Sequence, residues 1–126
     1  MTIPSSVADF WGRFVKASGA IDPARFYEAF SFGDNEQLAT SLAALVLDGT
    51  KRATAGSMWS FEAAGKRAPR QGDLSVVTSW AGTPFCVIET TRVDIVPFDD
   101  VNAEFAATEG EGDGSLAYWR QAHTEY

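Results

Sequence analysis

Lys51 and Thr54 are the side chains of this sequence whose types and spacing best suit chemistry. They lie three positions apart, directly after Gly49. Side chains alternate along a regular strand, so the two can face each other only if the chain turns or bulges between them. A threonine hydroxyl becomes a useful nucleophile when a neighbouring group takes its proton. The short pattern is also typical of a solvated lysine followed by a strand threonine, which is the commoner case.

A carboxylate would complete such a site, and we place Glu109 in that role. In one arrangement Lys51 is the general base and Glu109 orients it. A lysine serves as a base only where burial lowers its pKa toward neutrality. In the other arrangement Glu109 is the base and Lys51 stabilises an oxyanion. The sequence leaves both arrangements open.

Other kinds of catalytic centre have weaker support. One histidine and one cysteine cannot form a zinc site, and the acids of residues 109–113 lack the spacing of a calcium loop, so no metal site is predicted. A weak Mg²⁺ or Mn²⁺ site in this acidic stretch is an alternative to a mobile loop. His123 follows Trp119 late in a helix and is expected to pack or cap rather than to act as a base. Cys86 is expected to be a buried, unreactive thiol in a strand.

The composition favours one globular domain that does not bind nucleic acid broadly. Of the 126 residues 45% are hydrophobic, and four Trp and nine Phe argue against disorder. Seventeen acids against ten Lys and Arg residues give a formal charge of −7, which disfavours sequence-independent binding to phosphates. Four clustered bases are nevertheless compatible with a locally electropositive entrance to a site: Arg52, Lys66, Arg67 and Arg70.

The sequence predicts a cytoplasmic protein that does not enter a membrane. No apolar run approaches the ~20 residues that a transmembrane helix needs. Residues 1–6 show neither the basic nor the apolar region of a signal peptide. A single cysteine rules out an intramolecular disulfide and suits a reducing compartment.

Helices are predicted in the first part of the chain. Apolar spacing predicts an amphipathic helix over 5–18, with Ser6 as its cap. A second, short helix is predicted to start at Asp22-Pro23 and to carry the aromatic residues that follow. A third helix is predicted to begin after Asp34 or Asn35. Its buried stripe is predicted to be Leu38, Leu42, Leu45 and Val46.

Short strands and further helices are predicted after Gly49. The predicted strands span 52–57, 74–78, 85–91 and 93–97. A helical turn is predicted at 58–62, and two final helices are predicted to start at Asp99 or Asp100 and at Ser115. Helices, then strands, then helices, without repeated βαβ units, indicate an α+β domain with a small, mostly antiparallel sheet or barrel.

Four motifs taken in order resemble the ASCH domain family. They are Gly49-x-Lys51-x-x-Thr54, Gly72-Asp73-Leu74-Ser75, Ile88-Glu89-Thr90-Thr91-x-Val93, and Glu109 ahead of Ser115-Leu116-x-x-Trp119-Arg120. The resemblance covers about residues 26–126 and leaves 1–25 as an N-terminal helical extension. It implies a PUA-like fold, a small mixed or antiparallel β-barrel flanked by helices and related to RNA-binding domains. Members of the family usually continue past the last helix into a closing strand, whereas this sequence ends at Tyr126.

The resemblance also implies an activity. Small bacterial members of the family are amidohydrolases that remove the acetyl group from N4-acetylcytidine without a cofactor. By this resemblance Thr54 attacks the acyl carbonyl, Lys51 activates it or holds the oxyanion, and Glu109 sets the charge of Lys51 or moves the proton. An aromatic side chain near the motif suits stacking on a pyrimidine, although Trp59 is more readily placed in the core. The candidates for holding the base and ribose are Arg52, Ser57, Trp59 and Glu89.

Two alternatives to the amidohydrolase stay open. One is a non-catalytic RNA-binding module whose pocket reads a modified or flipped base. The other is a metal-dependent ribonuclease, because a similar family member is described as relying on a Lys near the same motif, a Tyr and a Ser. These would be Lys51 and Ser115 here, but Leu45 and Val46 stand where the Tyr is expected. The expected partner is therefore a nucleoside or RNA, and the sequence does not indicate an oligomeric state.

Overall fold

The structure is a computed structural model that describes residues 3–19, 21–33 and 35–124. The chain forms two compact units. The sheet unit comprises Met1–Ala43 and Arg67–Val93, and the helical unit comprises Ala44–Lys66 and Asp94–Tyr126. The mixture of helices and strands confirms the predicted α+β class.

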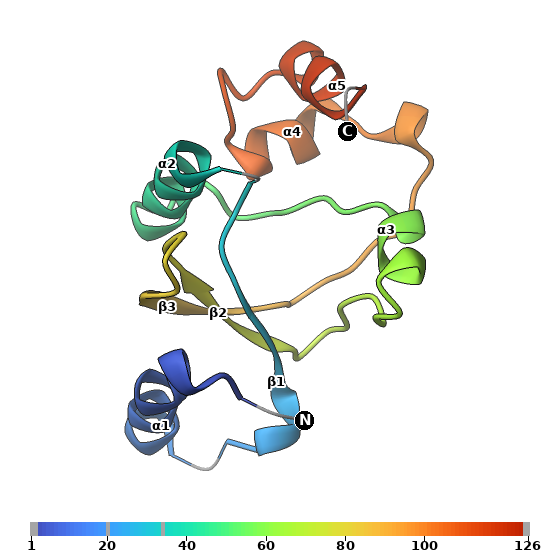
Figure 1. The fold of residues 1–126 in the computed structure, drawn as a ribbon. Coiled ribbons are helices and arrows are strands. Elements are labelled where there is room, and N and C mark those ends of the chain that lie inside the picture. Colours follow the sequence, from blue (N-terminus) through green and yellow to red (C-terminus); the bar gives the residue numbers. More distant parts are fainter. Residues whose placement is uncertain (1–2, 20, 34, 125–126) are drawn as a thin grey trace. The chain divides into compact units, whose positions relative to one another are not determined.

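A mixed sheet of β1 (Phe26–Phe30), β2 (Leu74–Thr78) and β3 (Pro84–Glu89) forms the centre of the sheet unit (Figure 1). Within the described residues the sheet has these three strands, in the order β1-β2-β3. β1 runs parallel to β2 with a bulge between Phe26 and Glu28, and β3 runs antiparallel to β2. Every residue of β2 is buried, as expected for a central strand that is covered on both faces.

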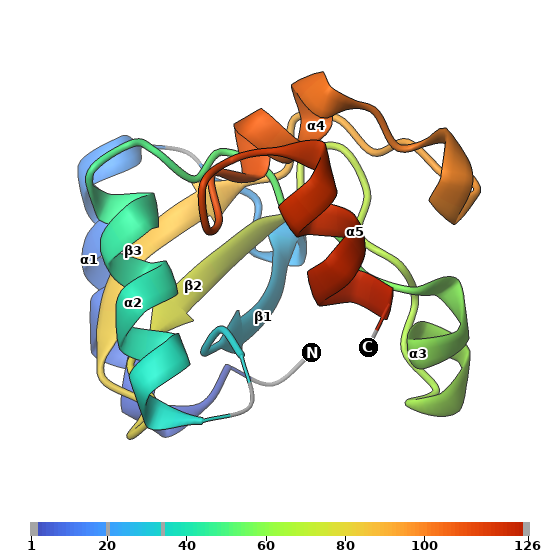
Figure 2. The ribbon, with the colours of Figure 1, turned by 90° about the horizontal axis from the view of Figure 1, so that it is seen from above.

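Helices α1 (Ser5–Ser18) and α2 (Glu36–Leu47) lie on opposite sides of this sheet (Figures 1 and 2). Val7 and Trp11, one helical turn apart, bury their side chains against the sheet. The core cluster consists of Val7, Trp11, Phe26, Leu74 and Val76. The helix predicted over 5–18 is therefore confirmed, but its Ser6 cap is wrong, because the helix begins at Ser5 and Pro4 is the N-cap.

The predicted second helix is only the single turn η1 (Pro23–Arg25). The Asp22 carboxylate accepts a hydrogen bond from Ala24 N at 2.9 Å, as the cap prediction required. The chain then enters β1, because the aromatic segment pairs with β2 instead of continuing as a helix. The start of α2 is capped by Asn35, whose Oδ1 accepts from Leu38 N at 2.8 Å, whereas Asp34 lies outside the described residues.

The buried stripe of α2 differs from the predicted one. Leu42 is buried as predicted, together with Ala39 and Ala43. Leu38 is 39% exposed, so its predicted burial is wrong. Leu45 and Val46 are half-buried.

The helical unit contains α3 (Met58–Ala63), η2 (Phe98–Asp100), α4 (Ala103–Glu109) and α5 (Leu116–Thr124). Its buried centre is Trp119, whose ring centroid lies 5.3 Å from that of Phe98 and 6.2 Å from that of Phe105. Ser115 caps α5 as predicted, through its Oγ, which accepts from Tyr118 N at 3.1 Å. The prediction of Asp99 or Asp100 as the cap of the preceding helix is wrong, because both lie in η2 and Asn102 caps α4.

The predicted strands over 52–57 and 93–97 are wrong. In the first segment Arg52 N donates to Thr108 O of α4 at 2.8 Å, and the Ser57 side chain caps α3. These contacts with helices take the place of pairing with a strand. In the second segment Ile95 is 73% exposed. β-Branched residues favour a strand only where they can pack against a pairing neighbour. The helices of the described residues include none that is both long and apolar enough to cross a membrane.

Candidate functional site

A turn at the end of α2 places Lys51. Gly49 adopts the left-handed conformation, with φ +85°, which is open to glycine at little cost. Thr50 N then donates to Asp48 Oδ1 at 2.8 Å, and Lys51 N donates to Leu45 O at 3.0 Å. These two hydrogen bonds fold the chain back, so the side chain of Lys51 points into the helical unit and its residue is only 5% exposed.

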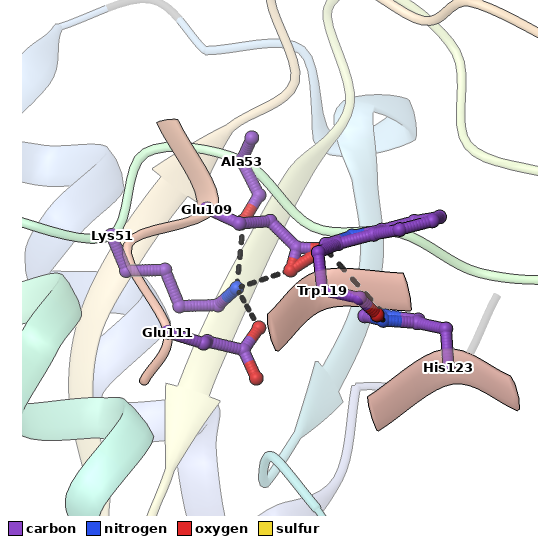
Figure 3. Close-up of polar contacts among 6 residues, drawn as sticks. All are labelled: Lys51, Ala53, Glu109, Glu111, Trp119 and His123. Carbon is purple, nitrogen blue, oxygen red and sulfur yellow. Dashed lines mark hydrogen bonds and ion pairs between the residues drawn. The ribbon is translucent and has the colours of Figure 1, made fainter. Parts of the chain in front are cut away.

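The ammonium group of Lys51 lies close to oxygens of Ala53, Glu109 and Glu111 (Figure 3). Its Nζ donates to Ala53 O at 2.7 Å and to Glu111 Oε2 at 2.8 Å. It lies 3.6 Å from Glu109 Oε2. A buried ammonium needs this kind of compensation, because the loss of hydration is otherwise unfavourable by several kcal/mol. The sequence therefore brings Lys51 and Glu109 together as predicted, and adds Glu111.

Glu109 is the last residue of α4 and is 1% exposed. Trp119 Nε1 donates to its Oε1 at 3.1 Å. His123 Nε2 lies 3.8 Å from the same oxygen. The His123 ring stacks on Trp119 with centroids 4.2 Å apart, and its Nδ1 donates to Trp119 O at 2.8 Å. The prediction that His123 packs is confirmed, and the ring also faces the buried carboxyl.

Glu109 has an unusual proton affinity. Burial and the hydrogen bond with Glu111 raise the pKa of Glu109 to about 7, against the opposing effect of the Lys51 charge. The pKa of Glu111 is lowered instead. Burial acts against this shift, but hydrogen bonds with Glu109 and Lys51 outweigh it. The site can therefore hold one proton on Glu109 near neutral pH while Lys51 and Glu111 form an ion pair.

This proton affinity makes the stability of the protein depend on pH. Below pH 4.5, Glu109 is protonated in both the folded and the unfolded chain. Between pH 4.5 and about 7 only the unfolded chain releases the proton, so rising pH favours unfolding by up to about 3 kcal/mol. Glu109→Gln removes this titration. We expect the unfolding free energy of the wild type, measured with urea and compared with that of the variant, to fall by this amount between pH 4.5 and about 7.

The effect of Glu111 has the opposite sign and a different range. Because its folded pKa is lowered, its contribution is lost as pH falls from the ordinary glutamate value, so it does not cancel the loss between pH 4.5 and 7. A difference in unfolding free energy that stays constant over pH 4.5 to 7 would contradict the raised pKa of Glu109.

A close backbone contact brings the end of α4 to the turn that carries Lys51. Gly110 ends α4 with φ +70°, and a Cβ built on it would lie 2.7 Å from Thr50 O. Together with the hydrogen bond from Arg52 N to Thr108 O, this contact fixes Glu109 beside Lys51. Glycine is therefore required at position 110 for two reasons, its backbone conformation and the lack of space.

Gly110→Ala is expected to lower the free energy of unfolding by about 2–3 kcal/mol, because strain and a steric clash add. Gly65→Ala is the matched control. Gly65 has φ +64°, but a Cβ there would meet no atom within 4 Å, so about 1 kcal/mol is expected from strain alone. Equal losses in the two variants, measured by urea unfolding, would show that the contact with Thr50 does not matter.

Thr54 is exposed and follows the carbonyl of Ala53 that accepts from Lys51 Nζ. The lysine therefore binds the peptide group that joins Ala53 to Thr54. This places the backbone of Thr54 beside the buried cluster, while its side chain remains open to solvent.

The other predicted site residues lie as follows. Trp59 is 75% exposed on α3, so its placement in the core is wrong. Arg52 is exposed, while Ser57 and Ser115 use their hydroxyls as helix caps. Glu89 belongs to the sheet unit, where its carboxylate pairs with Arg25 at 2.7 Å.

The sheet unit contains residues of two further predictions, the basic cluster and the thiol of Cys86. Of the predicted basic cluster, Arg67 is neutralised by a two-point pairing with Asp73, at 2.8 and 3.0 Å. Cys86 is half-buried rather than fully buried. Burial raises the pKa of its thiol, which fits the expected lack of reactivity.

Sequence reasoning missed Glu111 and the contact of His123 with Glu109. The acidic stretch is not a free loop at Glu111, whose carboxylate is held by Lys51. Within the part of the chain that the structure describes, no three His, Cys, Asp or Glu side chains are arranged to hold a metal ion. The four-residue spacing of Trp119 and His123 was the available signal, because residues i and i+4 share a helix face.

Comparison with known proteins agrees with this architecture. The family model of the ASCH domain matches residues 28–126. The crystal structure of an ASCH domain from Lactobacillus crispatus JV V101 is 32% identical, with a TM-score of 0.86 over 99% of this chain and 80% of that one. A protein from Enterococcus faecalis V583, assigned to the family model DUF984, is 27% identical, with a TM-score of 0.81 over 96% and 72% of the two chains. None of the curated proteins matches the chain.

Proposed function

Because the chain belongs to the ASCH domain family, we propose that it is an amidohydrolase that removes the acyl group from N4-acylated cytidine. One observation carries the proposal. Glu109, a buried carboxyl with its pKa raised to about 7, lies 3.6 Å from the ammonium of Lys51. Amide hydrolysis needs a group that first takes and then returns a proton, and a carboxyl of this pKa can do both at neutral pH.

The contacts of Lys51 support one of the two possible assignments. Its Nζ donates to Ala53 O and Glu111 Oε2, which uses the group as a cation and a hydrogen-bond donor. We therefore assign the role of base to Glu109 and the stabilisation of the oxyanion to Lys51. Thr54, next to the peptide group that Lys51 binds, is the nucleophile of the proposal.

The reaction then proceeds in two balanced halves. Glu109 takes the proton of the Thr54 hydroxyl as the oxygen bonds to the acyl carbon, and the carbonyl electron pair moves to an oxyanion that Lys51 stabilises. When this pair returns, the bond to N4 breaks and Glu109 gives its proton to the amine of cytidine. Water then attacks the Thr54 ester by the same sequence and releases the carboxylic acid. These steps use no cofactor.

Recognition of the nucleoside is assigned to exposed or half-buried groups near this cluster in the sequence. Trp59 offers an open indole face on which a pyrimidine can stack. Arg52 and Ser57 are the polar candidates for the base and ribose, and we keep Ser115 as a further candidate. The same exposed tryptophan favours the second candidate function, an RNA-binding module that stacks an unpaired base.

One experiment separates these functions. The protein is incubated with N4-acetylcytidine and, separately, with single-stranded RNA in the presence and absence of EDTA. Release of cytidine that EDTA does not affect supports the amidohydrolase. Cleavage of RNA that EDTA abolishes supports a metal-dependent ribonuclease, and binding of RNA without turnover supports the binding module. Absence of cytidine release at micromolar protein would overturn the proposed function.

A further inference from the structure

Glu111 lies closer to the ammonium of Lys51 than Glu109 does, yet no step of the proposed reaction uses it. We propose that Glu111 is a positioning residue of this site: it binds Lys51 and thereby keeps the proton on Glu109. This role rests on the proposed function, because it sets the pH above which Glu109 loses its proton and can act as the base.

The distances show that Lys51 interacts more closely with Glu111 than with Glu109. Lys51 Nζ lies 2.8 Å from Glu111 Oε2, within hydrogen-bonding range, and 3.6 Å from Glu109 Oε2, outside it. The side chain of Glu111 is 26% exposed, whereas those of Lys51 and Glu109 are each 2% exposed. The partly exposed carboxylate of Glu111 thus carries the negative charge, and the buried carboxyl of Glu109 holds the proton.

Two other groups that face the carboxyls of Glu109 and Glu111 come from different parts of the helical unit. Lys51 comes from the segment after α2, and the His123 ring comes from α5, with its Nε2 3.8 Å from Glu109 Oε1. Two carboxylates that share one site cannot both ionise easily. Since Glu111 holds the ion pair with Lys51, the proton remains on Glu109.

Glu111→Gln tests this division, because an amide keeps the shape and can still accept from Lys51. It removes the negative charge beside Glu109 and leaves the pair of Lys51 with Glu109 in place. Both conditions favour the ionised form of Glu109. We expect the midpoint of its titration, followed by the ¹³C resonance of its carboxyl, to fall from about 7 by about one pH unit or more.

The titration has matched controls. The Glu109 resonance is identified by its loss in Glu109→Gln. Glu104→Gln changes the same charge at an exposed position of α4 and is expected to leave the midpoint of Glu109 unchanged. Glu111→Asp keeps the charge and is expected to keep most of the raised midpoint. If Glu111→Gln leaves the midpoint of Glu109 where it is in the wild type, the positioning role is wrong.

The pH profile of kcat/KM for cytidine release provides a second readout. Its rising limb, which reports Glu109 as the base, is expected at lower pH in Glu111→Gln, whereas a residue that only supports folding would lower the rate at every pH. The two proposals fail in different ways. A wild-type protein that releases no cytidine overturns the function, while the titration of Glu109 still decides the role of Glu111.

Discussion

Thr54→Ala is expected to lower kcat/KM for the release of cytidine from N4-acetylcytidine by about 10³-fold or more, equivalent to about 4 kcal/mol of transition-state stabilisation. The variant lacks the oxygen that forms the acyl-enzyme, so only direct attack by water remains. Because Thr54 is exposed, the unfolding free energy is expected to change by about 0.5 kcal/mol or less. Steady-state kinetics and urea unfolding of the purified variant measure the two quantities.

Thr50→Ala is the matched control for this prediction. Thr50 is an exposed threonine on the other side of Lys51, and its hydroxyl takes no part in the proposed steps. We expect cytidine release by this variant to stay within about twofold of the wild-type rate. If Thr54→Ala retains as much activity as Thr50→Ala, Thr54 is not the nucleophile, and Glu109 would have to activate water directly.

The parts of the fold that could be predicted are those with a strong local pattern. The apolar spacing of Val7 and Trp11 correctly predicts the helix over 5–18, because a helix face is set by residues three and four apart. The segment 26–30 could not be predicted in this way. Its aromatic side chains fit either element, and the choice depends on a parallel partner, β2, that lies more than forty positions further along the chain.

The candidate site could also be predicted only in part. The turn at Gly49 and the residue types Lys51, Thr54 and Glu109 indicated chemistry, and the structure brings Lys51 and Glu109 to 3.6 Å. Glu111 could not be predicted, because an acidic residue in a glycine-rich stretch is usually solvated. What holds it is the buried charge of Lys51, sixty positions away in the chain. A charge relationship of this kind has no periodic signal in the sequence.

Lys51→Met is expected to lower the free energy of unfolding at pH 7 by about 3–5 kcal/mol, and to abolish cytidine release. Methionine keeps the length of the side chain, so the packing changes little. The charge and the hydrogen bonds are lost, however, which leaves the carboxylate of Glu111 without its ion pair and Ala53 O without its donor. The charge of Glu111 then lies unpaired on a side chain that is only 26% exposed, which is unfavourable by several kcal/mol.

Two further variants decide whether this loss comes from the ion pair. Lys16→Met removes an exposed lysine of α1 and is expected to change the unfolding free energy by about 0.5 kcal/mol or less. The double variant Lys51→Met with Glu111→Gln removes both charges, so it should be more stable than Lys51→Met alone. Losses that simply add in the double variant would mean that the two side chains are not coupled. The destabilisation in Lys51→Met would then come from packing, and the ion pair of Lys51 with Glu111 would not be what stabilises the site.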